Sequence, residues 1–231
     1  LNNDLSLPLY NNATQAQKAP GSTFKPIIAV AALEEGVVGQ TEQINCIGQY
    51  QESSPYLKCW VYPGMHGPLD AEHGIMNSCN VFFAEMGHRF SGAPDGSYDP
   101  ERGIEIIRKY ASMFGLDETS GIEISEKTPQ MTTEKPEASS IGQGTNSYSN
   151  VQLARYVTAM ANRGTVYNLS LLDKRTDSQG SILEDYTPEV RSEINISDST
   201  WTIVQRGMRK VISDGSARKI FSDLEIDIAG K

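Results

Sequence analysis

The chain has 231 residues, a formal net charge of −9 and a sequence pI of about 4.9. This acidic balance argues against nucleic-acid binding, which requires a basic face. Hydrophobic residues make up 38% of the sequence, enough for a packed core. No apolar run approaches the roughly 20 residues of a membrane span. The composition therefore favours a folded domain that does not bind nucleic acid and contains no membrane span.

The first predicted helix covers residues 23–35. Apolar residues recur along it at i, i+3, i+4, i+7 and i+8, the spacing of one buried helical face. Pro26 has no backbone N–H, so regular helix cannot begin much before this range, and Gly36 ends it. Ser22 therefore lies at the helix N-terminus. It shares one face with Lys25, three residues further along.

The segment after this helix is irregular, and a second helical pattern then covers residues 71–90. The Asn77–Ser78 pair can interrupt that pattern, because both residue types favour caps and turns. A strand-and-turn region with a hairpin tip at DSQGS is predicted over residues 165–199. The alternation in the final LEIDIAGK predicts the start of a strand. Three further helices are predicted over residues 101–115, 150–164 and 200–213.

An S-x-x-K motif spans Ser22 to Lys25, but alone it is a weak signal. About one such match is expected by chance, and a second one does occur, from Ser216 to Lys219. Order along the chain separates the two. Ser22 is followed by the only S-x-N in the sequence, SCN from Ser78 to Asn80, and then by IAGK at the end of a strand-like segment. Ser216 has no S-x-N after it. S-x-x-K, S-x-N and K-T-G together form the motif set of penicillin-interacting serine enzymes.

The chain resembles the transpeptidase domain of penicillin-binding proteins, and most closely the class B, monofunctional type. The matching stretches span nearly the whole chain in the right order: PLYNNATQAQKAPGSTFKP, CWVYPGMHGPLDAEHGIMNSCNVFF, GLDETSGIEI, IGQGTNSYSNVQLARYVTAMANRG and IAGK. The third motif stops at Lys231, without Thr-Gly, and the strands that usually precede the first helix are absent. We therefore expect residues 1–231 to be one incomplete transpeptidase domain, truncated at both ends, with no second domain.

The resemblance implies an α/β fold of the α+β type, with an antiparallel sheet flanked by helices and a helical subdomain. It implies that Ser22 is the nucleophile that attacks the D-Ala-D-Ala bond of a peptidoglycan stem peptide, and that Lys25 is its base. Ser78 would relay a proton to the leaving D-alanine, and Asn80 would hold the substrate amide and orient Lys25. Lys231 would attract the terminal carboxylate of the substrate and help to depress the pKa of Lys25.

Each of these residues also fits a plainer role. Ser78 and Asn80 are often a helix cap with a satisfied amide, and Lys231 would then be a surface residue. Gly142 and Gly144 in GQG are turn glycines, since no G-K-[ST] follows to make a phosphate loop. The histidines lie in no G-x-S-x-G or H-E-x-x-H context, which disfavours a histidine-dependent hydrolase or a zincin.

The three cysteines leave a choice open. Cys46, Cys59 and His66 have the spacing Cys-x12-Cys-x6-His, which fits a disulfide or free thiols. It also fits three ligands of a structural zinc, with His73 or Cys79 as the fourth. The spacing matches no standard zinc pattern well, so we favour a disulfide or free thiols. We expect no cofactor, no catalytic metal, and any metal at this grouping to be remote from the acyl chemistry.

The expected partners follow from the resemblance. They are peptidoglycan stem peptides, β-lactam antibiotics and other cell-wall synthesis proteins, at the extracytoplasmic face of a bacterial plasma membrane. The membrane would be reached through a segment outside this chain. Two enzymatic alternatives, a D,D-carboxypeptidase and a serine β-lactamase, differ in having water rather than an amine attack the acyl-enzyme. Another class remains open, a β-lactam receptor that acylates once and signals, or an inactive scaffold.

Overall fold

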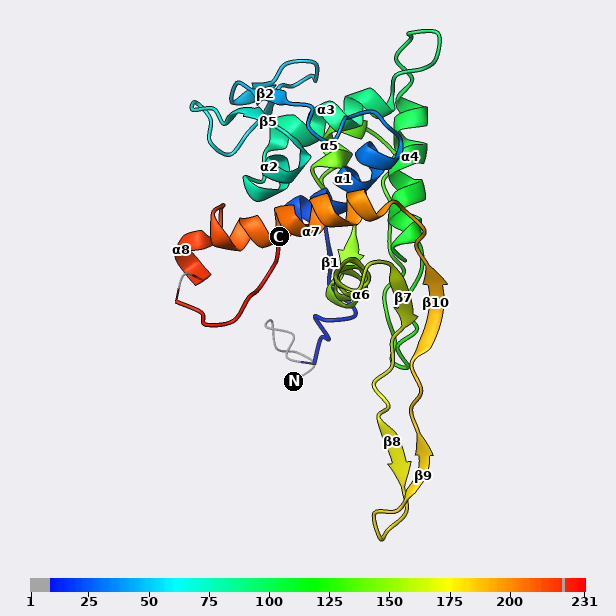
Figure 1. Cartoon of the computed structure of the whole chain (residues 1–231). Helices are drawn as coiled ribbons and strands as arrows, with labels where there is room; N and C mark the ends of the chain where they lie inside the picture. Colours follow the sequence, from blue (N-terminus) through cyan, green and yellow to red (C-terminus); the bar gives the residue numbers. More distant parts are fainter. Residues whose placement is uncertain (1–8, 222) are drawn as a thin grey trace. The chain divides into compact units, whose positions relative to one another are not determined.

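The computed structural model describes residues 9–221 and 223–231, so Pro8, which opens the first family-like stretch, lies outside them. Within these ranges the fold mixes α-helices with antiparallel strand pairs, as predicted, and each described ladder has two strands (Figure 1). The chain forms two compact units. Unit 1 comprises residues up to 18, 112–130 and 147–195, and unit 2 comprises 19–111, 131–146 and 196–231. No helix in the described ranges has the length and apolar character needed to cross a bilayer.

The first predicted helix is present in unit 2 and begins with a 3-10 turn. The turn η1 covers Gly21–Phe24, and the helix α1 covers Lys25–Glu34. Gly36 follows in the left-handed conformation, with φ of +67°, as a helix-ending glycine does. The prediction of a single apolar stripe is wrong. Every residue from Lys25 to Ala32 is buried, because other segments of unit 2 cover α1 on all sides.

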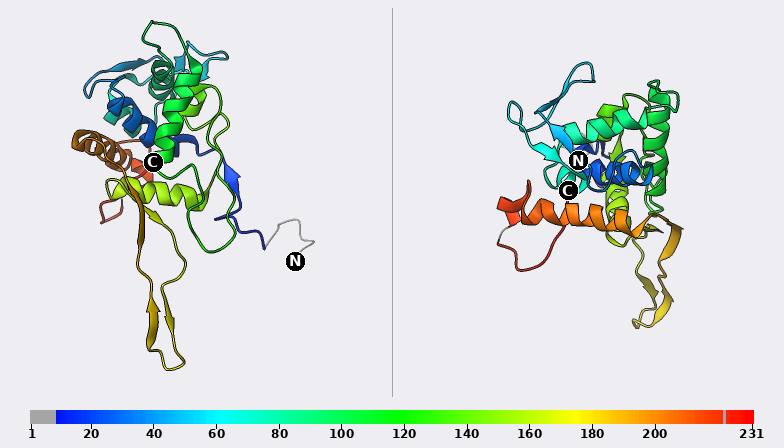
Figure 2. Two further views of the ribbon diagram at one scale, coloured as in Figure 1. Left: turned by 90° about the vertical axis from the view of Figure 1, so that its right-hand side faces the viewer. Right: turned by 45° about the horizontal axis from the view of Figure 1, so that its top comes forward.

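The predicted interruption of the second helix is also confirmed. Helix α2 (Ala71–Met76) and helix α3 (Asn80–Phe90) are separate, and Ser78 between them has φ of 52°. Helix α7 (Asp198–Ser213) packs against α2 and α1, and the short helix α5 (Pro136–Ser140) packs against α3 (Figures 1 and 2). No helix was predicted from the sequence over these residues. Pro136 supplies a good first residue for a helix, but five residues are too few for a periodic pattern.

Two short strand pairs complete the part of unit 2 near α3. Strand β2 (Ile44–Cys46) pairs with β5 (Gly67–Leu69), and β3 (Gln49–Tyr50) pairs with β4 (Leu57–Lys58). Residues 44–69 were predicted to be irregular, and these two ladders give the segment regular strand pairing. Helix α4 (Pro100–Met113), most of which belongs to unit 2, and helix α8 (Arg218–Phe221) are the remaining helices described there.

The strand predicted in LEIDIAGK is wrong. Residues 223–231 have no strand assignment, since no described strand pairs with them. Alternating side chains favour a strand only when a neighbour can complete its ladder. The segment is held instead by α7, where Gly230 N–H donates to the Met208 carbonyl and Arg209 donates to the Ile228 carbonyl.

Unit 1 is built around helix α6 (Asn150–Ala161), the predicted fourth helix. Strand β1 (Gln17–Lys18) pairs with β6 (Tyr148–Ser149), and β7 (Thr165–Asn168) pairs with β10 (Glu189–Glu193). Between β7 and β10, strands β8 (Lys174–Thr176) and β9 (Ile182–Asp185) form the hairpin predicted around DSQGS, which extends away from β7 and β10 in Figure 1.

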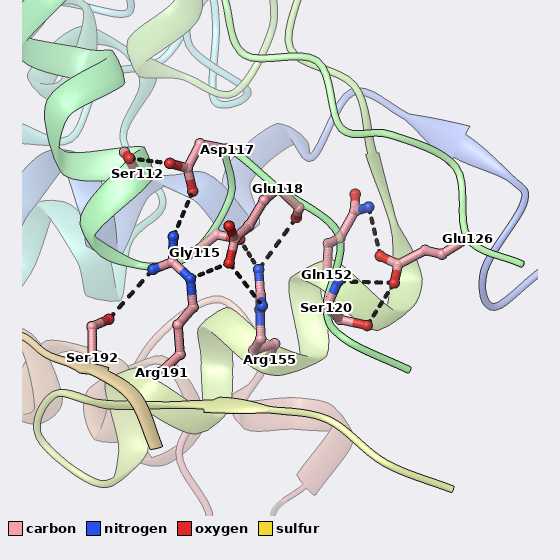
Figure 3. Close-up of polar contacts among 10 residues, drawn as sticks. All are labelled: Ser112, Gly115, Asp117, Glu118, Ser120, Glu126, Gln152, Arg155, Arg191 and Ser192. Carbon is pink, nitrogen blue, oxygen red and sulfur yellow. Dashed lines mark hydrogen bonds and ion pairs between the residues drawn. The ribbon is translucent and has the colours of Figure 1, made fainter. Parts of the chain in front are cut away.

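A polar network fixes the loop after α4 to the rest of unit 1 (Figure 3). The buried Arg155 donates to the carbonyls of Gly115 and Glu118, and Arg191 donates to the Glu118 carboxylate. Gln152 is fully buried and donates to Glu126 at 2.7 Å, while its own oxygen accepts from the N-cap residue of α6. Gln152 and Arg155 belong to the family-like stretch, and their role in the structure is to order unit 1.

Candidate active site

Lys25 is the centre of a cluster of hydrogen bonds within unit 2. Its Nζ lies 2.9 Å from the Ser78 carbonyl oxygen, 3.3 Å from Ser78 Oγ and 2.7 Å from Asn80 Oδ1. The side chain is fully buried, so these contacts replace its hydration. The structure therefore brings together three of the residues that the sequence singled out, although Lys25 and Ser78 are 53 positions apart.

The break between α2 and α3 positions the S-x-N segment. Ser78 adopts a left-handed backbone, which is costly for a residue with a side chain and is typical of functional sites. Asn80 is the first residue of α3, and its Nδ2 donates to the Lys58 carbonyl at 2.9 Å. Its Oδ1 is thereby turned toward Lys25. Trp60 adds a second tie, because its indole N–H donates to the Asn77 carbonyl at 2.8 Å.

Ser22 lies in the 3-10 turn, and its carbonyl accepts a hydrogen bond from the backbone N–H of Lys25. The half-buried Ser22 is thus one turn ahead of the lysine, at the start of α1. Gly142 of IGQG supports this turn, since its carbonyl accepts from Gly21 N–H at 2.9 Å. Gly142 has φ of +77°, and a Cβ there would collide with the Gly21 carbonyl. GQG is therefore a turn, as predicted, and it packs against the backbone that carries Ser22.

The electrostatics of the site favour a neutral amine. Burial, and then like-charge repulsion from Lys231, lower the pKa of Lys25 to about 7, although the nearby thiols of Cys79 and Cys59 oppose this shift. Burial also lowers the pKa of Lys231 to about 8. A lysine with a pKa near 7 can accept a proton at neutral pH.

Lys231 lies close enough to Lys25 for their charges to interact, and this repulsion lowers the pKa of Lys25 in the direction that we expected. It reaches this position in an irregular segment rather than in a strand. The second S-x-x-K pair is different, because Ser216 and Lys219 are both exposed.

The comparison with known families identifies the chain. The family described as "Penicillin binding protein transpeptidase domain" matches residues 1–231. The chain belongs to the penicillin-binding protein transpeptidase family. It is 30% identical to the peptidoglycan D,D-transpeptidase MrdA of Haemophilus influenzae, over 99% of this chain and 36% of that protein. It is 26% identical to stage V sporulation protein D of Bacillus subtilis, over 87% of this chain and 30% of that protein.

Solved structures of penicillin-binding proteins have the same fold. Pseudomonas aeruginosa PBP2 in complex with WCK 5153 aligns with a TM-score of 0.82 and 25% identity, covering 100% of this chain and 53% of that one. Penicillin-binding protein 2B of Streptococcus pneumoniae aligns with a TM-score of 0.79 and 22% identity, covering 95% of this chain and 39% of that one. The first supports the class B type, and the second shows the fold alone. The chain spans about a third of the length of the curated relatives that it matches.

This penicillin-binding protein domain has a second cluster beside Asn80, which we call the thiol cluster. It consists of Cys46, Cys59, His66 and Cys79, whose ligand atoms all lie within 4.8 Å of one another. The three thiols are free and buried. Cys59 Sγ lies 4.0 Å from Cys79 Sγ and 3.6 Å from His66 Nδ1.

These distances fit a zinc site. Tetrahedral zinc with bonds of about 2.3 Å to sulfur and 2.0–2.1 Å to nitrogen sets neighbouring ligand atoms about 3.5–3.8 Å apart. Three thiols and one imidazole are also a common ligand set of structural zinc. The hydrogen bond between Cys59 and Cys79 lowers the pKa of Cys59 and raises that of Cys79, so the buried pair favours one thiolate without any metal. The geometry therefore favours zinc over the disulfide or free thiols that we favoured from the sequence.

One expectation about this cluster is wrong. The cluster is not remote from the predicted active-site residues, since Cys79 lies between Ser78 and Asn80 and its Sγ caps α3 by accepting from Phe82 N–H. Of the two candidates for the fourth member, Cys79 is grouped with the other three, whereas Nδ1 of His73 lies 2.7 Å from Asp70 Oδ1. The backbone N–H of Asn80 donates to Cys59 Sγ. The spacing of the cysteines in the sequence did not predict this contact.

Proposed function

We propose that the protein containing this chain is a serine D,D-transpeptidase that cross-links peptidoglycan stem peptides and is acylated by β-lactams. One observation carries the proposal. A buried lysine with a pKa near 7 contacts the hydroxyl of Ser78 and the amide of Asn80, one helical turn after Ser22. We assign to these residues the roles of base, proton relay and substrate anchor for the hydroxyl of Ser22, since a serine hydroxyl is a weak nucleophile without a base.

In the first half-reaction, Ser22 Oγ attacks the carbonyl carbon between the last two D-alanines, and its proton passes to the neutral amine of Lys25. The backbone N–H of Ser22 stabilises the oxyanion at the helix N-terminus. The C–N bond then breaks. The leaving D-alanine takes a proton through Ser78, which is in contact with Lys25. The product is an ester between Ser22 and the stem peptide.

In the second half-reaction, an amine of a neighbouring stem peptide attacks this ester. Lys25 takes the proton that the attacking amine loses, and the new C–N bond forms the cross-link. The ester C–O bond breaks, and the Ser22 oxygen regains that proton from Lys25. Asn80 holds the substrate amide, and Lys231 attracts the terminal carboxylate of the donor or of a β-lactam. Two positive charges in one buried site repel each other, and a negatively charged ligand offsets this repulsion. The pair of lysines therefore favours anionic ligands.

The setting of this reaction is also a proposal. Relatives named peptidoglycan D,D-transpeptidase, and a solved structure titled as a peptidoglycan synthase complex, support a role among cell-wall synthesis proteins. We place the domain at the extracytoplasmic face of a bacterial plasma membrane, attached through a segment outside residues 1–231.

The test is labelling of the full-length protein with benzylpenicillin, followed by intact-mass measurement and peptide mapping. We expect one adduct per chain, on Ser22. The Ser22→Ala variant should show no adduct, and Ser216→Ala should label like the unmodified protein. An adduct on Ser216, or one that survives Ser22→Ala, would contradict the proposal. The lifetime of the adduct separates the alternatives, because rapid hydrolysis of nitrocefin would indicate a β-lactamase.

A second expectation concerns Lys231. Replacing it with methionine removes the like charge that lowers the pKa of Lys25, so the pH at which acylation is half-maximal should rise above its value in the unmodified protein. Stopped-flow acylation rates between pH 5 and 10 measure this shift. Lys219→Met is the matched control, since it removes an exposed lysine from the same C-terminal region and should leave the midpoint unchanged. An unchanged or lower pH midpoint of acylation in Lys231→Met would contradict the proposal that Lys231 lowers the pKa of Lys25.

A further inference from the structure

A cavity of about 420 Å³ lies in unit 2, at the far end of α3 from Asn80. We call it the Glu137 cavity. Its lining comes from segments distant in sequence: Pro55, Leu57, His88, Tyr98, Glu137 and Ala138. His88 is eight residues after Asn80 on the same helix, which separates the two by about 12 Å at 1.5 Å per residue. The cavity is therefore distinct from the site around Lys25.

The chemical feature of the cavity is a buried carboxylate. The side chain of Glu137 is only 10% exposed. Its Oε1 accepts from the Tyr98 hydroxyl at 2.7 Å and lies 3.3 Å from His88 Nδ1. Its Oε2 has no hydrogen-bond partner among residues 9–221 and 223–231, and it is not sealed from solvent. One oxygen is thus held in place, and the other is available to a ligand.

The surroundings of Glu137 favour a cation. Two other residues of the lining, Glu52 and Lys135, are charged, and both are exposed. Among the Asp, Glu, Lys and Arg residues of the described lining, only Glu137 is buried. The rings of His88 and Tyr98 stack with centroids 5.0 Å apart. A carboxylate beside aromatic faces attracts an ammonium group by ion pairing and by cation–π interaction.

The rest of the lining favours an aliphatic chain. Pro55 and Leu57 present apolar surface. The ion pair of Glu137 in this lining is with His88, which is charged only when protonated, so a neutral His88 leaves the buried carboxylate without a positive partner, which is costly. We propose that the Glu137 cavity binds a primary ammonium group carried on a short alkyl chain. The ammonium donates to Glu137 Oε2, and the chain lies against Pro55 and Leu57. The proposal does not depend on the acyl chemistry of Ser22.

The test is a titration of the full-length protein with n-butylammonium chloride, followed by NMR of the His88 and Tyr98 ring signals. We expect saturable shifts at these rings. Glu137→Gln should weaken binding at least tenfold, while Glu134→Gln, which removes an exposed carboxylate three residues earlier, should change it less than twofold. n-Butanol, with the same chain length and no charge, should bind at least tenfold more weakly than n-butylammonium.

A further variant keeps the test decisive if Glu137→Gln folds poorly. Tyr98→Phe keeps the half-exposed ring and removes one donor to Oε1, so it should bind n-butylammonium at least as well as the unmodified protein. Equal binding of butanol and butylammonium, or shifts that avoid both rings, would overturn the proposal. Nα-acetyl-lysine-N-methylamide distinguishes the source of the ligand. Tighter binding than butylammonium indicates a peptide-borne lysine, and tighter binding of cadaverine indicates a free amine.

Discussion

Replacing Lys25 with methionine should slow the acylation of Ser22 by benzylpenicillin by about 10³-fold, the scale of a lost general base. Methionine fills a similar buried volume and cannot accept the Ser22 proton. Lys25→Arg should be equally slow, because a guanidinium stays protonated at all usable pH values. The measurement is the second-order acylation rate constant by stopped flow. Lys109→Met, which removes an exposed lysine that pairs with Glu35 and lies over the Tyr110 ring, is the control and should acylate normally.

The pH profile gives a sharper form of the same prediction. The pKa of Lys25 is lowered to about 7, so the neutral amine predominates above pH 7. Acylation of the unmodified protein should therefore rise with pH, with a midpoint near 7, and then level off. The profile of Lys25→Met should lose this rise. A variant rate within tenfold of the unmodified protein, or a retained midpoint near 7, would rule out Lys25 as the base.

Stability should follow the same titration. The folded-state pKa of Lys25 lies below its unfolded value of 10.5, so between pH 7 and 10.5 the unfolded chain binds more protons than the folded one. The contribution of Lys25 to the free energy of unfolding is fully present above the unfolded pKa and is lost as the pH falls through 7. In Lys25→Met this part of the pH dependence should be absent from urea unfolding curves.

The features that the sequence could predict are local. Gly36, Gly115 and Gly164 all have positive φ at or near helix ends, and the helices predicted from the sequence end at these residues or directly before them. The break at Ser78 followed from the cap and turn preferences of its neighbours. By contrast, the prediction of a strand in LEIDIAGK failed, because a strand forms only beside a neighbouring strand, and the alternation of apolar and polar residues alone does not supply one.

The candidate site was predicted from the order of the S-x-x-K and S-x-N motifs and from the family resemblance. Nothing in the spacing of Lys25 and Asn80 states that their side chains meet at 2.7 Å. The thiol cluster shows the same limit. Cys46 and Cys59 come near each other because β2 pairs with β5 and β3 pairs with β4. Ladders of two or three residues leave almost no pattern in the sequence.

The second large effect is expected at the thiol cluster. We expect one zinc per chain in the full-length protein, measured by elemental mass spectrometry after extensive dialysis. Cys46→Ser removes the ligand from β2, outside the S-x-N segment, and should reduce the zinc content to below about one fifth of that value, since tetrahedral structural sites rarely tolerate the loss of a ligand. His73→Gln removes a histidine that pairs with Asp70, and it should retain zinc.

Loss of the metal should also lower the melting temperature, by about 10 °C if the site contributes about 3 kcal/mol to folding. Acylation should slow as well, because Cys59 and Cys79 hold the start of α3, and Asn80 there contacts Lys25. His73→Gln should show neither change. Purified protein that contains no zinc and has a Cys46–Cys59 disulfide would contradict the zinc assignment. If Cys46→Ser loses zinc but melts and acylates normally, the cluster binds metal without supporting Asn80, and the link between the two sites is wrong.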